Sequence, residues 1–443
     1  MLMTLRDYQN TAVQNLRDTY RSGCNAPVLV LPTGAGKTIV FTWIAKHAKG
    51  NVLILVHRVE LLRQTSDKLT AFGVHHGLIS PKYRPEYWWK VQVASVQTLV
   101  NRMDKINRPD LIIIDEAHHA TAGTWRRVLD SYGCRRLGVT ATPMRTDGTG
   151  LGEVFDSIVE GPTVSELIEL GYLTAPKIYA PAQIDLSGVK SRGGDYAKNE
   201  LAAAVDKPTI TGNAVSYYRK LADGIPAVAF CVSVDHACHV ADQFSEAGYR
   251  AEAVYGGHPR RDEILSELGK RIDVVCSCDL ISEGTDIPAI GCAIMLRPTQ
   301  SEGLYLQQVG RALRCYPGRS EAIILDHAGN VLRHGMPTDQ REWTLEGKVK
   351  KSRQKDEVTV SQCDSCYAVY SSGRICPECG HERELTPREI EQVEGELIEV
   401  KRVEKRRSQG QARSLEALRK IERERGYRRG WAERVYNGRK HRK

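Results

Sequence analysis

The sequence predicts an α/β protein in which two domains of similar size each contain a parallel β-sheet. Two series of short apolar segments support this fold class, one within residues 28–141 and one within residues 227–325. The segments are rich in valine, isoleucine and leucine and are separated by stretches with apolar residues at helical spacing. Strands of this kind that alternate with helices are typical of parallel sheets covered on both faces.

Five strands are predicted in each of these domains. The boundary between the domains is placed near Thr174, because residues 164–173 are predicted to form a helix that ends near Gly171. Residues 188–206, which are richer in glycine, lysine and aspartate, are predicted to be a loop insertion. The predicted strands are residues 28–31, 52–56, 91–95, 111–115 and 137–141 in the first domain and 227–232, 250–254, 273–276, 292–296 and 322–325 in the second.

The apolar alternation stops after about Gly347, so two smaller parts are expected beyond the α/β domains. This agrees with the chain length of 443 residues, which allows roughly three domains. The predicted division is 1–173 and 174–346 for the α/β domains, 347–390 for a cysteine-rich module and 391–443 for a basic helical tail.

A glycine-rich turn, L-P-T-G-A-G-K-T at residues 31–38, joins the first predicted strand to a helical stretch. Its glycines allow backbone N–H groups to surround an anion, and the helix N-terminus adds partial positive charge. An ordinary tight turn is the alternative, but the flanking strand and helix favour a phosphate-binding loop. Lys37 is expected to reach the β- and γ-phosphates of a nucleoside triphosphate, and the Thr38 hydroxyl to bind Mg²⁺. The other expected phosphate-binding residues are Thr33, Gly34, Ala35 and Gly36.

Two adjacent carboxylates, Asp115 and Glu116, directly follow the apolar residues 111–114. The carboxyl end of a parallel strand faces the crevice where α/β proteins bind ligands. Neighbouring carboxylates repel each other unless a cation lies between them. Asp115 is therefore predicted to hold Mg²⁺ opposite Thr38, and Glu116 to orient and deprotonate the attacking water.

Four cysteines form two C-x-x-C pairs that are separated by nine residues. Such pairs are typical of knuckles that present thiolates to one tetrahedral Zn²⁺, and so short a segment needs the metal to fold. A redox-active dithiol is the alternative, and His381 could replace the last cysteine. The sequence predicts a structural zinc ribbon with the ligands Cys363, Cys366, Cys376 and Cys379.

The other eight cysteines are scattered, mostly in apolar segments. This distribution predicts buried free thiols in a reducing cytoplasm rather than disulfides. No apolar stretch follows a basic start, and the longest apolar segments are the length of a strand. Neither a signal peptide nor a membrane span is therefore expected.

Positive charge is concentrated in the tail. Residues 401–443 contain 17 Lys and Arg against 5 Asp and Glu, a net charge of +12, whereas the whole chain carries +9. Residues 411–425 are predicted to form an amphipathic helix with a basic face. Aromatic and basic residues then alternate, a combination suited to phosphate contacts and base stacking on single strands. A charged, partly disordered tail is the alternative to nucleic-acid binding by Tyr427, Arg428, Arg429 and Trp431.

The pair Lys37-Thr38 together with Asp115-Glu116-Ala117-His118 resembles the superfamily-two helicases of the DEAH-box type. Further motifs match in the order of that family, and the resemblance covers roughly residues 1–335. The matching segments are L-R-D-Y-Q at 5–9 (Q motif), H-R-V-E-L at 57–61 and S-V-Q-T at 95–98 (strand-contacting motifs), T-A-T-P at 140–143, I-S-E-G-T-D-I-P at 281–288 (motif V) and Q-Q-V-G-R-A-L-R at 307–314 (motif VI).

The resemblance implies two RecA-like domains that bind ATP between them and close on it. Arg311 and Arg314, three residues apart, would share one helix face and clamp the γ-phosphate as an arginine finger. His118 would bridge to Gln307. By the same resemblance, Arg6 and Gln9 would contact adenine, Gly284 and Asp286 of motif V would belong to the nucleotide site, and Arg58, Gln97 and Thr98 would contact nucleic acid.

The four-cysteine module and the G-W-A segment at residues 430–432 extend the resemblance to the bacterial RadD-like branch of these helicases. That branch implies a DNA-dependent ATPase of repair or recombination, with DNA and repair proteins as partners, in the cytoplasm of a bacterium or encoded by a phage. An RNA-directed helicase and an ATP-gated nucleic-acid clamp that does not unwind are the alternatives. A restriction motor is also conceivable, although the chain shows no clear nuclease motif.

Overall fold

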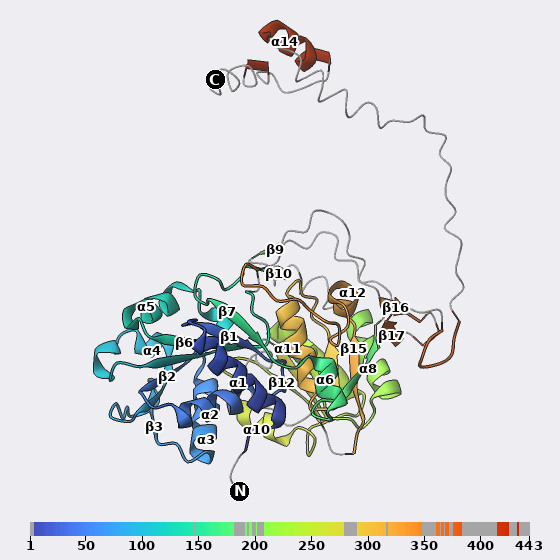
Figure 1. Cartoon of the computed structure of the whole chain (residues 1–443). Helices are drawn as coiled ribbons and strands as arrows, with labels where there is room; N and C mark the ends of the chain where they lie inside the picture. Colours follow the sequence, from blue (N-terminus) through green and yellow to red (C-terminus); the bar gives the residue numbers. More distant parts are fainter. Residues whose placement is uncertain are drawn as a thin grey trace. The chain divides into compact units, whose positions relative to one another are not determined.

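The chain divides into two compact units, residues 1–383 and 384–443 (Figure 1). Among the described residues, no helix has the length and apolar character needed to cross a membrane. The computed structural model describes residues 4–145, 147–180, 191–192, 195–196, 201, 208–278, 290–315, 318–347, 360–363, 365–366, 368–371, 375–382, 414–424 and 432–433.

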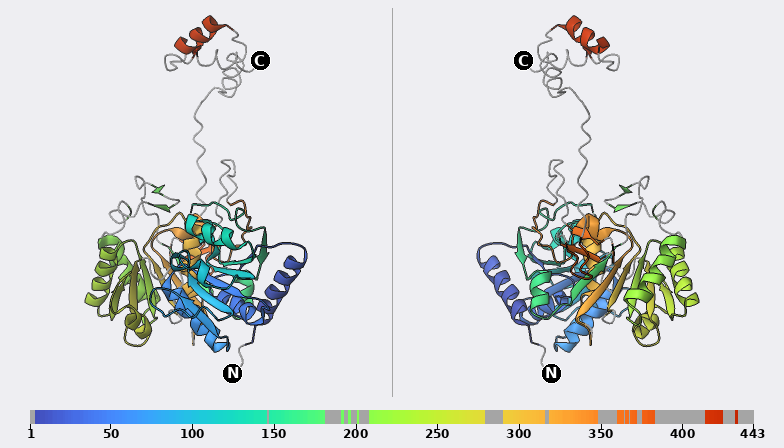
Figure 2. Two further views of the ribbon diagram at one scale, coloured as in Figure 1. Left: turned by 90° about the vertical axis from the view of Figure 1, so that its left-hand side faces the viewer. Right: turned by 90° about the vertical axis from the view of Figure 1, so that its right-hand side faces the viewer.

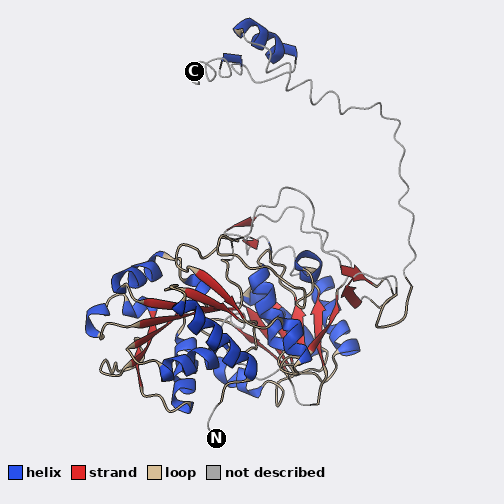
Figure 3. Cartoon of the chain, in the orientation of Figure 1, coloured by secondary structure: helices blue, strands red, loops and turns tan. Residues whose placement is uncertain are grey.

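The first sheet contains seven parallel strands in the order β3-β4-β2-β5-β6-β1-β7. Successive side chains of a strand point to opposite faces, so Leu29 packs on one face and Val28 on the other. The first face is covered by α1 (Asp7–Arg21), α2 (Lys37–His47) and α3 (Val59–Ala71), the second by α4 (Val96–Leu99) and α5 (Gly123–Tyr132) (Figures 2 and 3). The strands are β1 (Pro27–Val30), β2 (Val52–Val56), β3 (His76–Ile79), β4 (Val91–Ser95), β5 (Leu111–Asp115), β6 (Arg135–Thr140) and β7 (Ser157–Glu160), and two short 3₁₀ helices span Met103–Lys105 and Ala117–His119.

The second sheet contains eight strands in the order β12-β13-β11-β14-β15-β8-β17-β16. The first six are parallel, whereas β17 pairs antiparallel with β8 and β16 pairs antiparallel with β17. The strands are β8 (Ala175–Tyr179), β11 (Ala227–Cys231), β12 (Ala251–Val254), β13 (Val274–Cys278), β14 (Cys292–Met295), β15 (Glu321–Asp326), β16 (Val360–Gln362) and β17 (Ala368–Ser371).

Helices also cover both faces of the second sheet. One face packs against α8 (Pro208–Leu221) and α9 (Val234–Glu246), and the other against α10 (Arg261–Glu267), α11 (Glu302–Ala312) and α12 (Asn330–His334). The α11 face and the α1–α3 face of the first sheet belong to one continuous apolar cluster, in which Leu173 and Val309 are buried. The two sheets are therefore joined by buried apolar contacts as well as by the chain.

The predicted fold class is confirmed, since each predicted strand segment overlaps an observed strand. The helix predicted at 164–173 is α6 (Val164–Glu169), whose first turn is fixed by a reciprocal pair of hydrogen bonds between Thr163 and Glu166. Three further strands of the two α/β domains, β3, β7 and β8, were not predicted, because each is short and only partly buried. β8 begins one residue after Thr174, and its pairing with β15 assigns it to the second sheet.

The cysteine-rich segment continues the second sheet through β17 and belongs to the same compact unit as both α/β domains. Within residues 188–206, which were expected to form a loop, the structure describes a short hairpin of β9 (Ser191–Arg192) and β10 (Asp195–Tyr196). In the second unit, α14 (Leu415–Glu424) lies within the helix predicted for residues 411–425.

Candidate nucleotide and metal sites

The predicted phosphate-binding loop lies between β1 and α2. Gly34 and Gly36 adopt φ angles of +92° and +79°, which favour glycine because L side chains rarely adopt them. A Cβ on Gly36 would also lie 2.7 Å from Nε2 of Gln9. The helix α2 begins at Lys37, so its first N–H groups face the loop. This is the backbone arrangement that an anion-binding loop requires.

One pocket of about 250 Å³ brings together predicted residues from both α/β domains. The first domain contributes the loop, Asp115 and Glu116, and the second contributes residues of α11 and Arg314 just beyond it. The predicted residues that line it are Thr33, Gly34, Gly36, Lys37, Thr38, Asp115, Glu116, Gln307, Arg311 and Arg314.

The charged groups of this pocket perturb one another. Burial lowers the pKa of Lys37, while the nearby carboxylates of Glu116 and Asp115 act in the opposite direction. Burial and the charge of Glu116 raise the pKa of Asp115 well above its ordinary value, although Lys37 opposes this. A divalent cation beside the two carboxylates would relieve their repulsion, so the donor set fits Mg²⁺.

Glu116 has an unusual backbone, with φ of +50°, and is the one non-glycine residue with positive φ in the described ranges. Its carboxylate lies 3.5 Å from Nδ1 of His118. That nitrogen is 3.4 Å from the hydroxyl of Thr140, which in turn donates to the carbonyl of Thr142 (3.0 Å). Polar contacts thus link the second carboxylate to the T-A-T-P segment. The predicted bridge from His118 to Gln307 stays a prediction.

The Q-motif residues lie beside the phosphate-binding loop. The carbonyl of Ala35 accepts hydrogen bonds from the hydroxyl of Tyr8 (2.9 Å) and from Nε2 of Gln9 (3.1 Å). The guanidinium of Arg6 stacks 4.3 Å above the ring of Tyr172. Sequence reasoning missed Tyr8 and Tyr172; the L-R-D-Y-Q segment was a signal for the first, and nothing marked the second. Adenine contacts by Arg6 and Gln9 stay predictions.

The residues expected to contact nucleic acid in the first domain follow two neighbouring strands. Arg58 precedes α3 and follows β2, and Gln97 and Thr98 lie in α4 directly after β4. Because β2 and β4 are parallel neighbours, both segments lie at the carboxyl edge of the first sheet. Ser95 donates to Oε1 of Gln97 (3.0 Å) and orients that side chain.

Several predicted site residues lie outside the described residues. They are Gly284 and Asp286 of motif V, and Tyr427, Arg428, Arg429 and Trp431 of the tail.

The four predicted zinc ligands converge on one point. Their sulfur atoms lie within 4.8 Å of one another, with Cys363 and Cys379 3.5 Å apart and Cys366 and Cys376 3.6 Å apart. A tetrahedral ion with Zn–S bonds of about 2.3 Å places its sulfur ligands about 3.8 Å apart, so the cluster fits this metal. Burial opposes ionisation of Cys363, but N–H groups of Cys366 and Ser365 outweigh it and lower the pKa of Cys363 to about 6. In the described part of the chain none of the other eight cysteines forms a disulfide.

Comparisons with known proteins agree with this geometry. The family model "Type III restriction enzyme, res subunit" matches residues 2–145, and the "Helicase conserved C-terminal domain" model matches residues 213–316. A 51.5 kDa protein of a Lactococcus phage is 35% identical over 388 residues, which are 84% of this chain and 83% of that protein. The chain belongs to the superfamily-two helicases.

Other relatives of this helicase-family chain are longer. A Saccharomyces cerevisiae protein that carries the name of an ATP-dependent helicase, IRC3, is 32% identical, and the match covers 67% of this chain and 47% of the yeast protein. Two solved structures share the fold. An HsdR fragment assigned to a type I restriction enzyme of Vibrio vulnificus has a TM-score of 0.60 at 20% identity, and the match covers 74% of this chain and 65% of the fragment. The Type ISP restriction-modification enzyme LlaBIII bound to DNA has a TM-score of 0.54 at 17% identity, and the match covers 73% of this chain and 28% of the enzyme.

Metal analysis is expected to find about one zinc per chain of this helicase-family protein. Replacement of Cys363 and Cys366 together by serine should abolish the zinc content, because both thiolates of one knuckle are lost. Cys24→Ser is the matched control, since Cys24 is a free thiol far from the cluster in sequence. If zinc content survived the double replacement, the cluster would not be a zinc site.

Proposed function

We propose that the chain is a DEAH-type ATP hydrolase that uses ATP to translocate on, unwind or remodel DNA. The observation that carries this proposal is the shared pocket, in which the phosphate-binding loop and two carboxylates of the first domain face two arginines of the second. Such a pocket makes hydrolysis depend on the approach of the two domains.

In the proposed mechanism, the backbone N–H groups of residues 33–36 and the ammonium of Lys37 bind the β- and γ-phosphates. Thr38 and Asp115 would hold Mg²⁺, which neutralises phosphate charge when bound. Glu116 orients the attacking water and accepts its proton, and its contact with His118 keeps the carboxylate in place. Arg311 and Arg314 stabilise the charge that develops on the transferred phosphoryl group.

Two contacts between the domains support coupling of hydrolysis to domain movement. A guanidinium nitrogen of Arg261 in α10 lies 2.8 Å from Oε1 of Glu60, two residues after Arg58. Gly303 of α11 packs so closely on the T-A-T-P segment that a Cβ would lie 2.8 Å from Oγ1 of Thr142. Movement of the second domain would therefore shift both the segment that contains Arg58 and the T-A-T-P segment, which contacts His118.

DNA is the proposed nucleic acid. The choice of DNA rests on the DNA complex of the structurally similar restriction-modification enzyme. The position of Arg58, Gln97 and Thr98 at one sheet edge supports binding of nucleic acid in general. A role in repair or recombination, membership of the RadD-like branch, a cytoplasmic location in a bacterial or phage setting, and DNA contacts by the basic tail are further parts of the proposal. The cysteine cluster would hold a structural Zn²⁺ with no open coordination position.

The decisive test compares the ATPase rate with single-stranded DNA, duplex DNA and RNA. Stimulation by DNA is expected, and stimulation by RNA alone would replace this proposal with the RNA-directed alternative. Strand displacement measured under the same conditions separates a motor from an ATP-gated clamp. Truncation after residue 383, at the boundary between the two compact units, tests the contribution of the tail.

Gly310→Ala is expected to lower ATP hydrolysis by about 100-fold while ATP binding persists. A Cβ at this position of α11 would lie 2.5 Å from Cβ of Thr33, so the second domain could not approach the loop as closely. Turnover and ATP binding should be measured side by side. Gly256→Ala is the control, because a Cβ there meets nothing within 4 Å. Wild-type turnover in Gly310→Ala would show that close approach is not required.

A further inference from the structure

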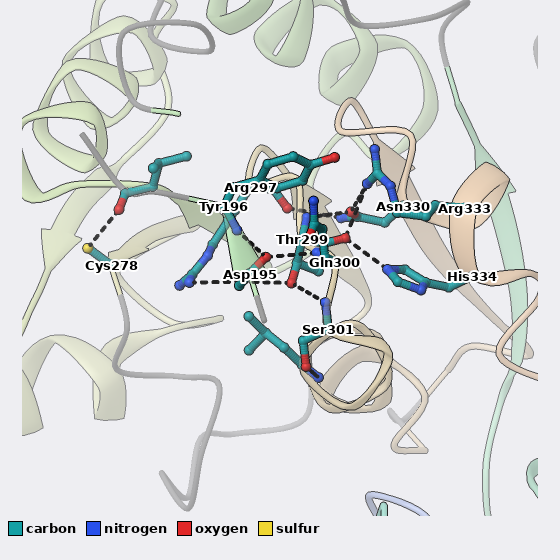
Figure 4. Close-up of polar contacts among 12 residues, drawn as sticks. Asp195, Tyr196, Cys278, Arg297, Thr299, Gln300, Ser301, Asn330, Arg333 and His334 are labelled. Carbon is teal, nitrogen blue, oxygen red and sulfur yellow. Dashed lines mark hydrogen bonds and ion pairs between the residues drawn. The ribbon is translucent and has the colours of Figure 1, made fainter. Parts of the chain in front are cut away.

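A carboxylate from the β9–β10 hairpin lies in a cluster of hydrogen-bond donors on the second domain (Figure 4). Oδ2 of Asp195 accepts a hydrogen bond from the hydroxyl of Thr299 (2.9 Å), and Oδ1 accepts one from the backbone N–H of Gln300 (2.7 Å). The guanidinium of Arg297 lies 3.6 Å from Oδ2. The side chains of Arg297 and Asp195 are only 11% and 13% exposed. A hydroxyl, a backbone N–H and a guanidinium that face one anion are the donors that proteins use for phosphate groups.

The backbone of this cluster and the hydroxyl of Thr299 have further contacts that do not involve Asp195. The side chain of Asn330, at the start of α12, accepts from the N–H of Thr299 (3.0 Å) and donates to the carbonyl of Arg297 (3.0 Å). The carbonyl of Thr299 accepts a hydrogen bond from His334 (2.9 Å), and the hydroxyl oxygen of Thr299 accepts one from the N–H of Ser301 (3.0 Å). Both Thr299 and Asn330 are fully buried. In the cluster formed by Arg297, Thr299 and Gln300, the anion cradle, the backbone of residues 297–299 is thus preorganised by α12.

The anion cradle lies where a bound strand would be expected. Arg297 lies two residues after the end of β14, so the cradle is at the carboxyl edge of the second sheet. Cys278, the last residue of β13, appears in the same view of that edge (Figure 4). Open α/β sheets bind ligands at this edge, and the first sheet carries Arg58 and Gln97 at its own carboxyl edge.

We propose that the anion cradle is a binding site for a backbone phosphate of nucleic acid, and that the carboxylate of Asp195 occupies it until nucleic acid displaces it. The inference rests on the proposed function, and it adds a specific phosphate contact and a competing group from the same chain. Because a carboxylate and a phosphodiester are both anions that accept from the same donors, the two cannot occupy the cradle together.

The carboxylate belongs to the β9–β10 hairpin, which can be displaced. Its described strands, β9 and β10, pair only with each other through two residue pairs and form a sheet separate from the two large ones. A two-stranded hairpin is marginally stable by itself. The stacking of Arg333 on the ring of Tyr196, 5.4 Å from its centroid, is one described contact that would be lost on displacement.

The test is the affinity of the full chain for a fluorescent oligothymidylate, measured over a series of salt concentrations with a non-hydrolysable ATP analogue. Asp195→Ala removes the competing carboxylate from the cradle and should tighten binding about tenfold, the effect of roughly one charge-assisted hydrogen bond. The slope of log affinity against log salt should steepen by about 0.7, as expected for one added phosphate contact on a single strand. Thr299→Val in the Asp195→Ala background should cancel most of the gain.

Asp223→Ala is the matched control, since it removes the same charge at the amino end of β11, on the sheet edge opposite the cradle. There Asp223 accepts a hydrogen bond from the hydroxyl of Tyr249 (2.8 Å). This control should change binding less than twofold, because an exposed charge at that distance is screened by salt. Unchanged or weaker binding by Asp195→Ala would overturn the inference and leave Asp195 as an anchor of the hairpin. Equal tightening by Asp223→Ala would also overturn it. Wild-type protein that binds no nucleic acid would instead refute the proposed function itself.

Discussion

Arg314→Ala is expected to reduce ATP hydrolysis by about 10³–10⁵-fold while ATP affinity changes little. Arg314 lines the nucleotide pocket, and a Cβ on Gly34 would lie 3.6 Å from its Cγ, so its side chain is placed over the phosphate-binding loop. Its backbone forms an isolated β-bridge with Leu173, which fixes it beside the connection between the domains. An arginine in this place acts mainly on charge that develops during transfer of the phosphoryl group, and binding of ATP itself depends on it less.

The measurement is single-turnover hydrolysis together with equilibrium binding of a fluorescent ATP analogue. Arg314→Lys should fall between the alanine variant and the wild type, because lysine keeps the charge but lacks the planar pair of donors. Arg271→Ala, which removes an arginine with an 87% exposed side chain, should be neutral. Loss of nucleotide binding with an unchanged rate for the bound fraction would contradict the role as an arginine finger.

Lys37→Ala is expected to lower turnover by on the order of 10³-fold and, unlike Arg314→Ala, to weaken ATP binding as well. Lys37 is the first residue of α2 and shares its pocket with Asp115 and Glu116. Without its ammonium, the phosphates of ATP would face the two carboxylates with one positive charge fewer, so both the ground state and the transition state would be destabilised.

Binding and turnover should again be measured separately, and Lys49→Ala supplies an exposed lysine of the same domain as the control. Substantial hydrolysis by Lys37→Ala would remove the proposed role of the loop. Comparison of the two variants is informative, because a loss confined to hydrolysis identifies a group that acts when the domains approach. A loss of binding as well identifies a group of the phosphate-binding loop.

The fold and half of the nucleotide pocket could be predicted because their signals are local. The apolar strands, the loop before Lys37 and the adjacent pair Asp115-Glu116 are each visible within a few residues. The approach of Arg311 and Arg314 to that loop was expected only through resemblance to the helicases, since spacing alone does not place one domain against another. The positive φ of Glu116 and the contact from Glu60 to Arg261 have no local signal.

The contact between Asp195 and Thr299 also could not be predicted from a local sequence signal. The two residues are 104 positions apart, and residues 188–206 read as a polar loop without periodicity. Whether such a loop packs against the domain depends on donors that the fold assembles elsewhere, here between β14 and α12. β8 was missed for a related reason: its sequence A-P-K-I-Y is only partly apolar, and it becomes a strand because β15 and β17 pair with it.

The position of β17 on β8 also bears on solubility. Without β17, one side of β8 would present unpaired backbone N–H and C=O groups, which makes an exposed strand edge a template for self-association. The hairpin of β16 and β17 covers that edge through the pairs Ala368–Tyr179 and Val369–Ile178, and the ion pair of Lys177 with Glu378 adds a charged contact beside it. A metal held by Cys363 and Cys366, in the turn of this hairpin, together with Cys376 and Cys379 would thus keep the edge of β8 covered and protect the second domain from self-association through that strand.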